Sequence, residues 1–201
     1  VGKSNEYLIE RLQTMKSKIA TTFTDKDIAT KAVKEIISIY AEKISNWIYY
    51  STNARDVFDM KHEYVVGRGV LKDTLEVIEG IKASRIVLEK TDLIDLKFRI
   101  ITSYPSIDDE ETMRTSNLSY FCKCYLIMLD YDEELEDIVK EFIEKETPEK
   151  VSELRSECKN ILNAIDMARG ENLKQIIAGS SVLDIGEDEM MEIIKFIYQN
   201  L

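Results

Sequence analysis

His62 is the only histidine in the 201-residue chain, and Arg55 stands seven positions before it. Histidine alone titrates near neutral pH without perturbation, so His62 is the natural candidate for a general acid or base. The guanidinium of arginine offers a planar fork of donors that fits a phosphate group. On a helix, seven residues turn a side chain by only about 20° and advance it by about 10.5 Å, so both groups would face the same way. Arg55 and His62 are therefore the first candidates for a catalytic pair.

The order Arg55, Asp56, His62 resembles the Arg-x(4–6)-His motif of HEPN-domain ribonucleases, over eight residues of the chain. This resemblance implies a helical, usually dimeric bundle that cleaves RNA without a metal. It would make Arg55 the phosphate-binding residue and His62 the acid/base group. A second interpretation needs no chemistry: Arg55 pairs with Asp59 one helical turn later, and His62 is an ordinary surface residue.

Two acidic stretches could bind a metal. The run 130–137, continued by Glu141, resembles the spacing of an EF-hand calcium loop, but Leu135 stands where the loop needs glycine. The acids at 108–111 follow a predicted helix start, where negative charge stabilises the helix dipole. Both stretches are therefore predicted to be acidic helix starts, and no metal site is expected.

The cysteines and glycines also lack the partners that a site requires. Cys122, Cys124 and Cys158 have no histidine nearby for a zinc site, so we expect buried thiols. Gly67 and Gly69 are not followed by the further glycines of a phosphate-binding loop. The sequence predicts no cofactor, and no catalytic residue outside the Arg55 and His62 alternative.

The composition favours an acidic helical protein. Two prolines and seven glycines are few, and 44% of the residues are apolar, enough for a substantial core. The net charge of −11 opposes binding to DNA or to an anionic membrane. An odd number of cysteines indicates reduced thiols, so we expect a cytoplasmic protein. The first residue is valine, which suggests a fragment of a longer chain.

Apolar residues recur at helical spacing along most of the chain. A helix over about 53–90 is predicted at the centre, with Gly67 to Gly69 either inside it or at a kink; continuity is favoured. A strand over Lys97–Thr102 is the one alternative, set aside because its neighbours look helical. The expected fold is all-α: one domain over 1–201, with a subdivision near 104–106. The other helices are expected over about 4–23, 24–50, 92–104, 106–128, 130–145, 147–170, 171–178 and 187–199.

Ten tyrosines and one tryptophan in a chain without an evident catalytic set favour a helical module that binds another protein. The expected function is therefore a non-enzymatic interaction or regulatory domain. The alternatives are a HEPN-like metal-independent ribonuclease of the toxin or phage-defence type using Arg55 and His62, and a ligand-sensing helical bundle. The expected partner is a protein, with RNA only under the ribonuclease alternative. No DNA binding and no membrane insertion are expected, and the chain could form a homodimer.

Overall fold

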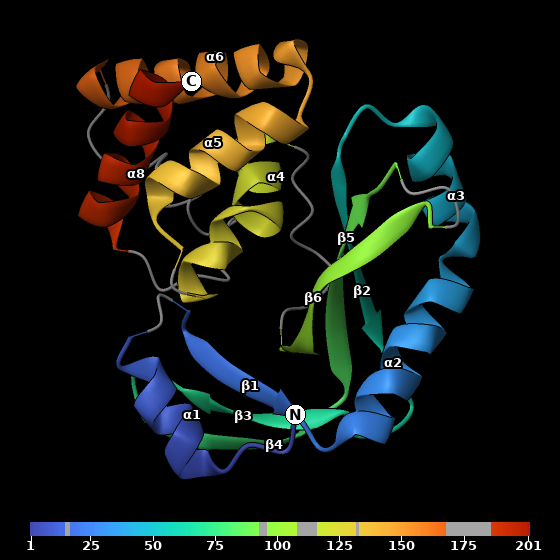
Figure 1. Ribbon diagram of the computed structural model, residues 1–201. Coiled ribbons are helices and arrows are strands. Elements are labelled where there is room, and N and C mark those ends of the chain that lie inside the picture. The colour runs from blue at the N-terminus through green and yellow to red at the C-terminus, as the bar shows by residue number, and fades with distance from the viewer. Residues whose placement is uncertain (15–16, 93–95, 108–115, 132, 168–185) are drawn as a thin grey trace. The chain divides into compact units, whose positions relative to one another are not determined.

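The computed structural model describes residues 1–14, 17–92, 96–107, 116–131, 133–167 and 186–201 (Figure 1). The chain divides into two compact units, Val1–Glu110 and Glu111–Leu201. The first unit contains two three-stranded antiparallel sheets together with helices, and the second is helical where it is described. The all-α prediction is therefore wrong, and the molecule is of the mixed α+β class.

Two sheets, with strand orders β1-β3-β4 and β2-β5-β6, form the framework of the first unit. Every strand pair is antiparallel. The elements follow one another as α1 (Asn5–Leu12), β1 (Ile19–Phe23), α2 (Lys26–Ile39), α3 (Ala41–Tyr50), β2 (Arg55–Lys61), β3 (Gly67–Leu71), β4 (Val77–Ile81), β5 (Ala83–Lys90) and β6 (Phe98–Ser106).

Helix α1 begins where the sequence predicts, because the Ser4 hydroxyl accepts a hydrogen bond from the Tyr7 backbone N–H. It is much shorter than expected. Leu8 and Leu12 pack on Ala20 of β1 and on a valine of β3, so the apolar residues after the helix belong to a strand. Burial in a sheet has overridden the local helical spacing.

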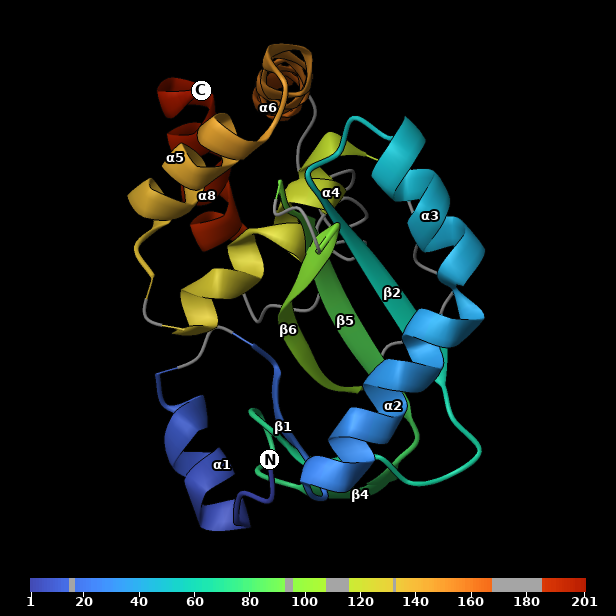
Figure 2. The same cartoon turned by 45° about the vertical axis from the view of Figure 1, so that its right-hand side comes forward.

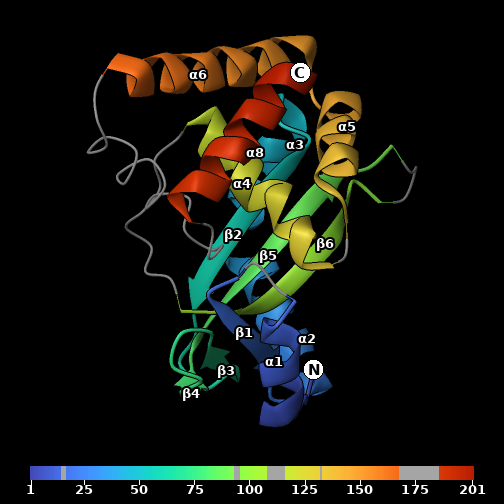
Figure 3. The ribbon, with the colours of Figure 1, turned by 90° about the vertical axis from the view of Figure 1, so that its left-hand side faces the viewer.

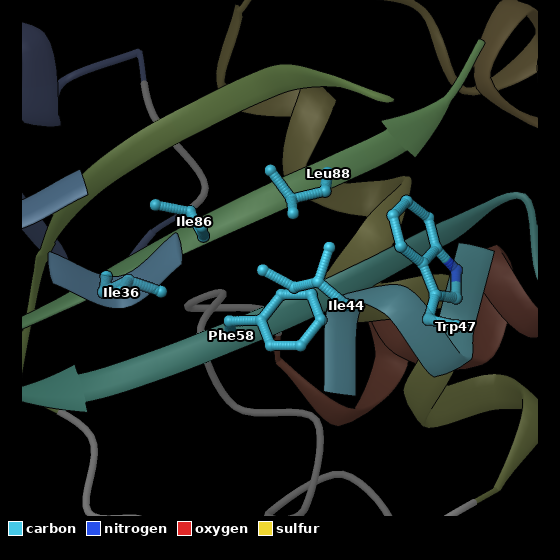
Figure 4. Close-up of a cluster of buried hydrophobic side chains, with 6 residues drawn as sticks. All are labelled: Ile36, Ile44, Trp47, Phe58, Ile86 and Leu88. Carbon is cyan, nitrogen blue, oxygen red and sulfur yellow. The ribbon is translucent and has the colours of Figure 1, made fainter. Parts of the chain in front are cut away.

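Helices α2 and α3 cover one face of the β2-β5-β6 sheet (Figure 2). The predicted helix 24–50 is split at Tyr40, whose backbone leaves the helical region with φ −93° and ψ 14°. Asp25 caps α2 by accepting from the Ile28 N–H at 2.8 Å. The core between these helices and the sheet is drawn in Figure 4 and consists of Ile36, Ile44, Trp47, Phe58, Ile86 and Leu88.

The long central helix predicted over 53–90 does not exist, and this stretch forms β2, β3, β4 and β5 instead. Residues four apart lie on one face of a helix and also on one face of a strand, so steps of four do not separate the two structures. The apolar positions Phe58 and Met60, and likewise Ile86 and Leu88, are two apart and face α2 and α3. That alternation is the signature of a half-buried strand.

The two glycines that would have interrupted that helix lie where three strands come close. A Cβ at Gly67 would stand 2.3 Å from the Thr22 carbonyl oxygen and 2.6 Å from Cγ of Pro105. A Cβ at Gly69 would stand 2.8 Å from Cδ1 of Ile19. Glycine is needed at these places because β1 and the end of β6 pass too close to β3 for a side chain.

The second unit contains α4 (Asn117–Cys124), the 3-10 helix η2 (Leu126–Tyr131), α5 (Leu135–Lys145), α6 (Pro148–Met167) and α8 (Glu187–Asn200), seen from the side in Figure 3. The predicted start at Thr147 is confirmed, with Pro148 as the first helical residue. Phe121, Tyr125 and Phe142 pack ring against ring in the core. The predicted helix 171–178 lies outside the described residues. In the described part of the chain, no helix has the length and apolar character to cross a membrane.

Candidate active site on the sheet of β2, β5 and β6

The β2-β5-β6 sheet has one apolar face and one charged face. Its apolar face is the one covered by α2 and α3, and Phe58 of β2 lies opposite Ile86 of β5 on it. Side chains alternate along a strand, so Arg55 and Asp59 point to the other face. On the neighbouring strand β5, Glu89 lies opposite Arg55 and Arg85 lies opposite Asp59. The charged side chains form two rows across the strands.

The first row joins Asp59 of β2, Arg85 of β5 and Tyr104 of β6, which lie opposite one another in register. The Arg85 guanidinium donates from Nε to Asp59 Oδ1 at 2.6 Å and from Nη2 to Oδ2 at 3.2 Å. Burial disfavours the charge on Arg85, but the neighbouring Tyr104 and Asp59 outweigh that effect and raise the pKa of Arg85. A permanent cation therefore stands beside the Tyr104 hydroxyl.

The second row joins Arg55 of β2, Glu89 of β5 and Arg99 of β6. Arg55 donates from Nε to Glu89 Oε2 at 2.8 Å. Arg99 donates from Nε to Glu89 Oε1 at 2.9 Å and from Nη2 to the same oxygen at 2.5 Å. A single buried carboxylate thus binds two guanidinium groups, one on each side of its strand.

A β-bulge at Ile101 places the rows on one face. Val87 of β5 pairs with Thr102 of β6, but the next residue of β5, Leu88, pairs with Ile100. Ile101 is therefore an extra residue on β6 without an opposite partner. A bulge shifts the alternation of side chains by one residue. Thr102 and Tyr104 therefore share the charged face with Arg99 of the second row.

The end of β6 that carries Tyr104 is tied to the other sheet. The Thr21 hydroxyl of β1 donates to the Pro105 carbonyl oxygen at 2.9 Å. Thr102 and Tyr104 are both only partly buried, unlike Pro105. At the junction between the sheets the Tyr104 hydroxyl oxygen is buried next to the Arg85 cation, and a hydroxyl held beside a cation is an arrangement that suits a phosphate ligand.

His62 lies in a closed network on the other side of the sheet. It is 2% exposed, and its Nδ1 is 2.8 Å from Glu35 Oε2 while its Nε2 is 2.8 Å from the Ser84 hydroxyl oxygen. Tyr64 also donates to Glu35 Oε2, at 2.9 Å. The hydrogen bonds from His62 and Tyr64 hold the pKa of Glu35 below its ordinary value of 4.5. Burial and the bond to Glu35 raise the pKa of Tyr64 to about 12.

The structure does not bring Arg55 and His62 together. Arg55 is the first residue of β2 and His62 directly follows its last residue, so an extended stretch separates them by about 23 Å. Arg55 pairs with Glu89, not with Asp59 as the non-catalytic interpretation has it. The helical geometry on which the HEPN resemblance depends is absent from this stretch, since residues 55–61 form a strand.

The other residues that the sequence offered for a site are the three cysteines and the two acidic stretches. Cys122, Cys124 and Cys158 are buried free thiols, as expected. Burial raises the pKa of both Cys122 and Cys158 to about 12. The acids at 108–111 lie outside the described residues, and Leu135 begins helix α5. Among the residues that the structure describes, no group of three or more His, Cys, Asp or Glu side chains is placed to hold a metal.

Sequence reasoning gave no site role to Asp59, Arg85, Glu89, Arg99 and Tyr104, because it assigned helix to all six strands. The available signal was the short β-branched run near Lys97–Thr102, which was set aside and proves to lie largely within β6. A correct strand assignment would have placed charged residues at alternate positions.

A family model described as "Bacterial CdiA-CT RNAse A domain" matches residues 1–105. The chain is also similar to a solved structure, the CdiA-CT/CdiI complex from Y. kristensenii 33638, with 25% sequence identity and a TM-score of 0.50. That similarity covers 53% of this chain and 93% of the other. No curated protein matches the chain. The family match lies within the first compact unit.

Proposed function

This chain belongs to the family of bacterial CdiA-CT RNase A domains, and from this membership we propose that it is a ribonuclease of the toxin type. The prediction of a non-enzymatic, all-helical regulatory module is wrong, because the family is one of ribonucleases and the fold of this chain contains two sheets. The ribonuclease alternative fits better, although not through the HEPN fold or its motif. The family match over residues 1–105 carries the proposal.

The reaction we propose is attack of the ribose 2′-hydroxyl on the adjacent phosphorus, with release of the 5′-oxygen of the next nucleotide. Negative charge increases on the phosphate oxygens as the new P–O bond forms, so the site must offer hydrogen-bond donors and positive charge there. A proton must also leave the 2′-hydroxyl and another must reach the departing oxygen. The charged face of the β2-β5-β6 sheet supplies the first of these requirements.

Tyr104 is the residue we place against the phosphate. Its hydroxyl lies beside the Arg85 guanidinium, which favours donation to an anionic oxygen and stabilises charge that develops there. Arg85 is itself fixed by its two bonds to Asp59 and positions Tyr104. Thr102 lies two residues earlier on the same face, about 7 Å away along the strand, and adds a second hydroxyl.

His62 is not placed in the reaction. It is buried, and both ring nitrogens are engaged by Glu35 and Ser84. A general acid or base must reach the proton that it transfers, within hydrogen-bond distance or through one water. His62 therefore supports the fold where helix α2 meets β5, and the proposed ribonuclease does not depend on it.

The proposed partners are an RNA substrate and a protein. The similar structure from Y. kristensenii 33638 is a complex of CdiA-CT with CdiI. We propose that a protein of corresponding role binds this chain.

The test is cleavage of a labelled RNA oligonucleotide by the purified protein in the presence of EDTA. We expect cleavage of RNA and none of the same oligonucleotide with a 2′-deoxyribose at the cleaved position. Tyr104→Phe should lower kcat/KM by about 100-fold, the size of effect typical for loss of one donor to the developing charge.

The control for Tyr104→Phe is Tyr50→Phe on helix α3, where the side chain belongs to a residue 82% exposed. It should cleave RNA like the wild type, and both variants should melt within a few degrees of it. Cleavage of the 2′-deoxy oligonucleotide as well as the RNA would overturn the proposed reaction. Absence of any RNA cleavage would overturn the proposed function.

A further inference from the structure

Arg99 is a solvent-facing arginine held in place by a buried acid. Its side chain is 57% exposed, whereas that of Glu89, which accepts two of its hydrogen bonds, is 2% exposed. The fork of an arginine normally loses conformational entropy when it binds an anion. Because Glu89 already fixes the guanidinium of Arg99, less of that freedom remains to be lost.

The second row carries an excess of positive charge. Glu89 binds Arg99 on one side and Arg55 on the other, so two cations share one carboxylate. In the first row, by contrast, one arginine, Arg85, faces one carboxylate, Asp59. Within a chain of net charge −11, the Arg99 end of β6 is thus a local positive site on the charged face of the sheet.

The distance between the two rows decides what Arg99 could bind. Arg85 and Glu89 are four residues apart on β5, which corresponds to about 13 Å along the strand. One phosphate group cannot contact both Tyr104 and Arg99 across that distance. A polynucleotide presents successive phosphates along one chain, however, and a strand lying along β6 could reach both positions.

We infer that Arg99, fixed by Glu89 and supported by Arg55, binds a second phosphate of the RNA strand, away from the phosphate that is cleaved. This inference rests on the proposed ribonuclease function and specifies how the substrate lies, along β6 from Tyr104 towards Arg99. It makes the enzyme prefer polynucleotides to dinucleotides. Arg99 is a binding residue that acts on affinity and not on the chemical step.

The test compares the wild type with Arg99→Gln on two substrates, a dinucleotide with one phosphate and an RNA of about eight nucleotides. The variant should cleave the dinucleotide with unchanged kcat/KM. On the longer RNA its KM should rise about tenfold while kcat stays constant, because uniform binding energy is lost. Arg99→Lys, which keeps the charge without the fork, should lie between the two.

A second readout does not depend on cleavage. The affinity for a non-cleavable 2′-deoxy oligonucleotide is measured at several salt concentrations. In Arg99→Gln the slope of log K against log salt should be shallower by about 0.7, the contribution of one phosphate contact on a single strand. The control is Lys34→Gln on α2, which removes one exposed positive charge from the opposite side of the sheet. It should leave both the slope and the KM unchanged.

The outcomes separate the two proposals. If the wild type cleaves neither substrate, the ribonuclease function fails and this inference fails with it. If the wild type cleaves both, but Arg99→Gln changes the two substrates equally or leaves the longer one unaffected, only the second phosphate position is overturned. An equal loss of salt dependence in Lys34→Gln would likewise overturn it, since the effect would then be one of overall charge.

Discussion

Arg99 and Tyr104 stand five residues apart on β6, yet both side chains lie on the charged face of the β2-β5-β6 sheet. In a regular strand, residues an odd number of positions apart point to opposite faces. The extra residue at Ile101 removes this difference. Bulges often occur next to active sites because they re-aim side chains without changing the sheet around them.

Deleting Ile101 should therefore disrupt the charged face. Regular pairing would turn either the Phe98–Ile100 segment or the Thr102–Ser106 segment to the wrong side of the sheet. We expect a lower melting temperature and the loss of most RNA cleavage. Ile101→Ala, which keeps the residue count, should retain the bulge and most of the activity. Full activity in the deletion variant would show that the alignment of Arg99 with Tyr104 is not required.

Arg55→Ala should destabilise the protein by about 3 kcal/mol, because it leaves the buried Glu89 carboxylate with fewer charged partners. Urea unfolding measures this change, and Lys61→Ala, an exposed position on the same strand, is the control. Molecules that remain folded should still cleave RNA. Complete loss of cleavage in a folded Arg55→Ala protein would instead indicate direct contact with the substrate, as the HEPN resemblance implies.

The charge of Glu35 should stabilise the folded protein at neutral pH but not at strongly acidic pH. His62 and Tyr64 lower the pKa of Glu35 in the folded state from 4.5, so its ionised form stabilises the fold above that value. This contribution is lost as the pH falls through the lowered pKa. Urea unfolding from pH 7 to pH 3 should show a constant deficit for Glu35→Gln above about pH 5 that shrinks at lower pH.

The control for this pH series is Glu42→Gln, which removes an exposed acid on α3. Its stability should follow the wild-type curve, because the contact between Glu35 and His62 remains intact. A deficit of Glu35→Gln that stays the same down to pH 3 would show that the carboxylate charge is not the source of the stabilisation.

Gly67→Ala should cost about 1–3 kcal/mol, the usual effect of forcing a methyl group into a packed site. The new Cβ would meet the Thr22 carbonyl oxygen at 2.3 Å and Pro105 Cγ at 2.6 Å. Thermal melting measures the change. Gly186→Ala is the control, since a Cβ there has no neighbour within 4 Å, and should cost less than about 1 kcal/mol. Equal melting temperatures for the two variants would contradict the close approach of β6 to β3.

The features that sequence analysis predicted correctly are local ones. Ser4 caps α1, Pro148 begins α6, and α5 covers most of its predicted range, because caps and amphipathic spacing act within a few residues. The sheets could not be predicted in this way. The residues of β1 pair with those of β3, far along the chain, and a five-residue strand has room for only two or three alternations.

The candidate site depended on the same long-range pairing. Arg55 was recognised as a residue able to bind phosphate, but its partner was sought one helical turn away at Asp59. In the fold, Glu89 occupies that role because β5 runs beside β2. Tyr104 lay only at the end of the helix predicted over 92–104. Its neighbour Arg85 comes from a different strand and could not be inferred from spacing along the sequence.

Among the described residues of the first unit, β6 is the last strand, and it carries Arg99, Thr102 and Tyr104 together. A growing polypeptide has therefore built all other strands of this sheet before any of these side chains has been synthesised. A chain that stops before Phe98 contains Arg55, Arg85 and Glu89 but not the groups that we place against RNA. Under the proposed function, the chain emerging from the ribosome would lack the groups that we place against RNA until β6 itself had been made.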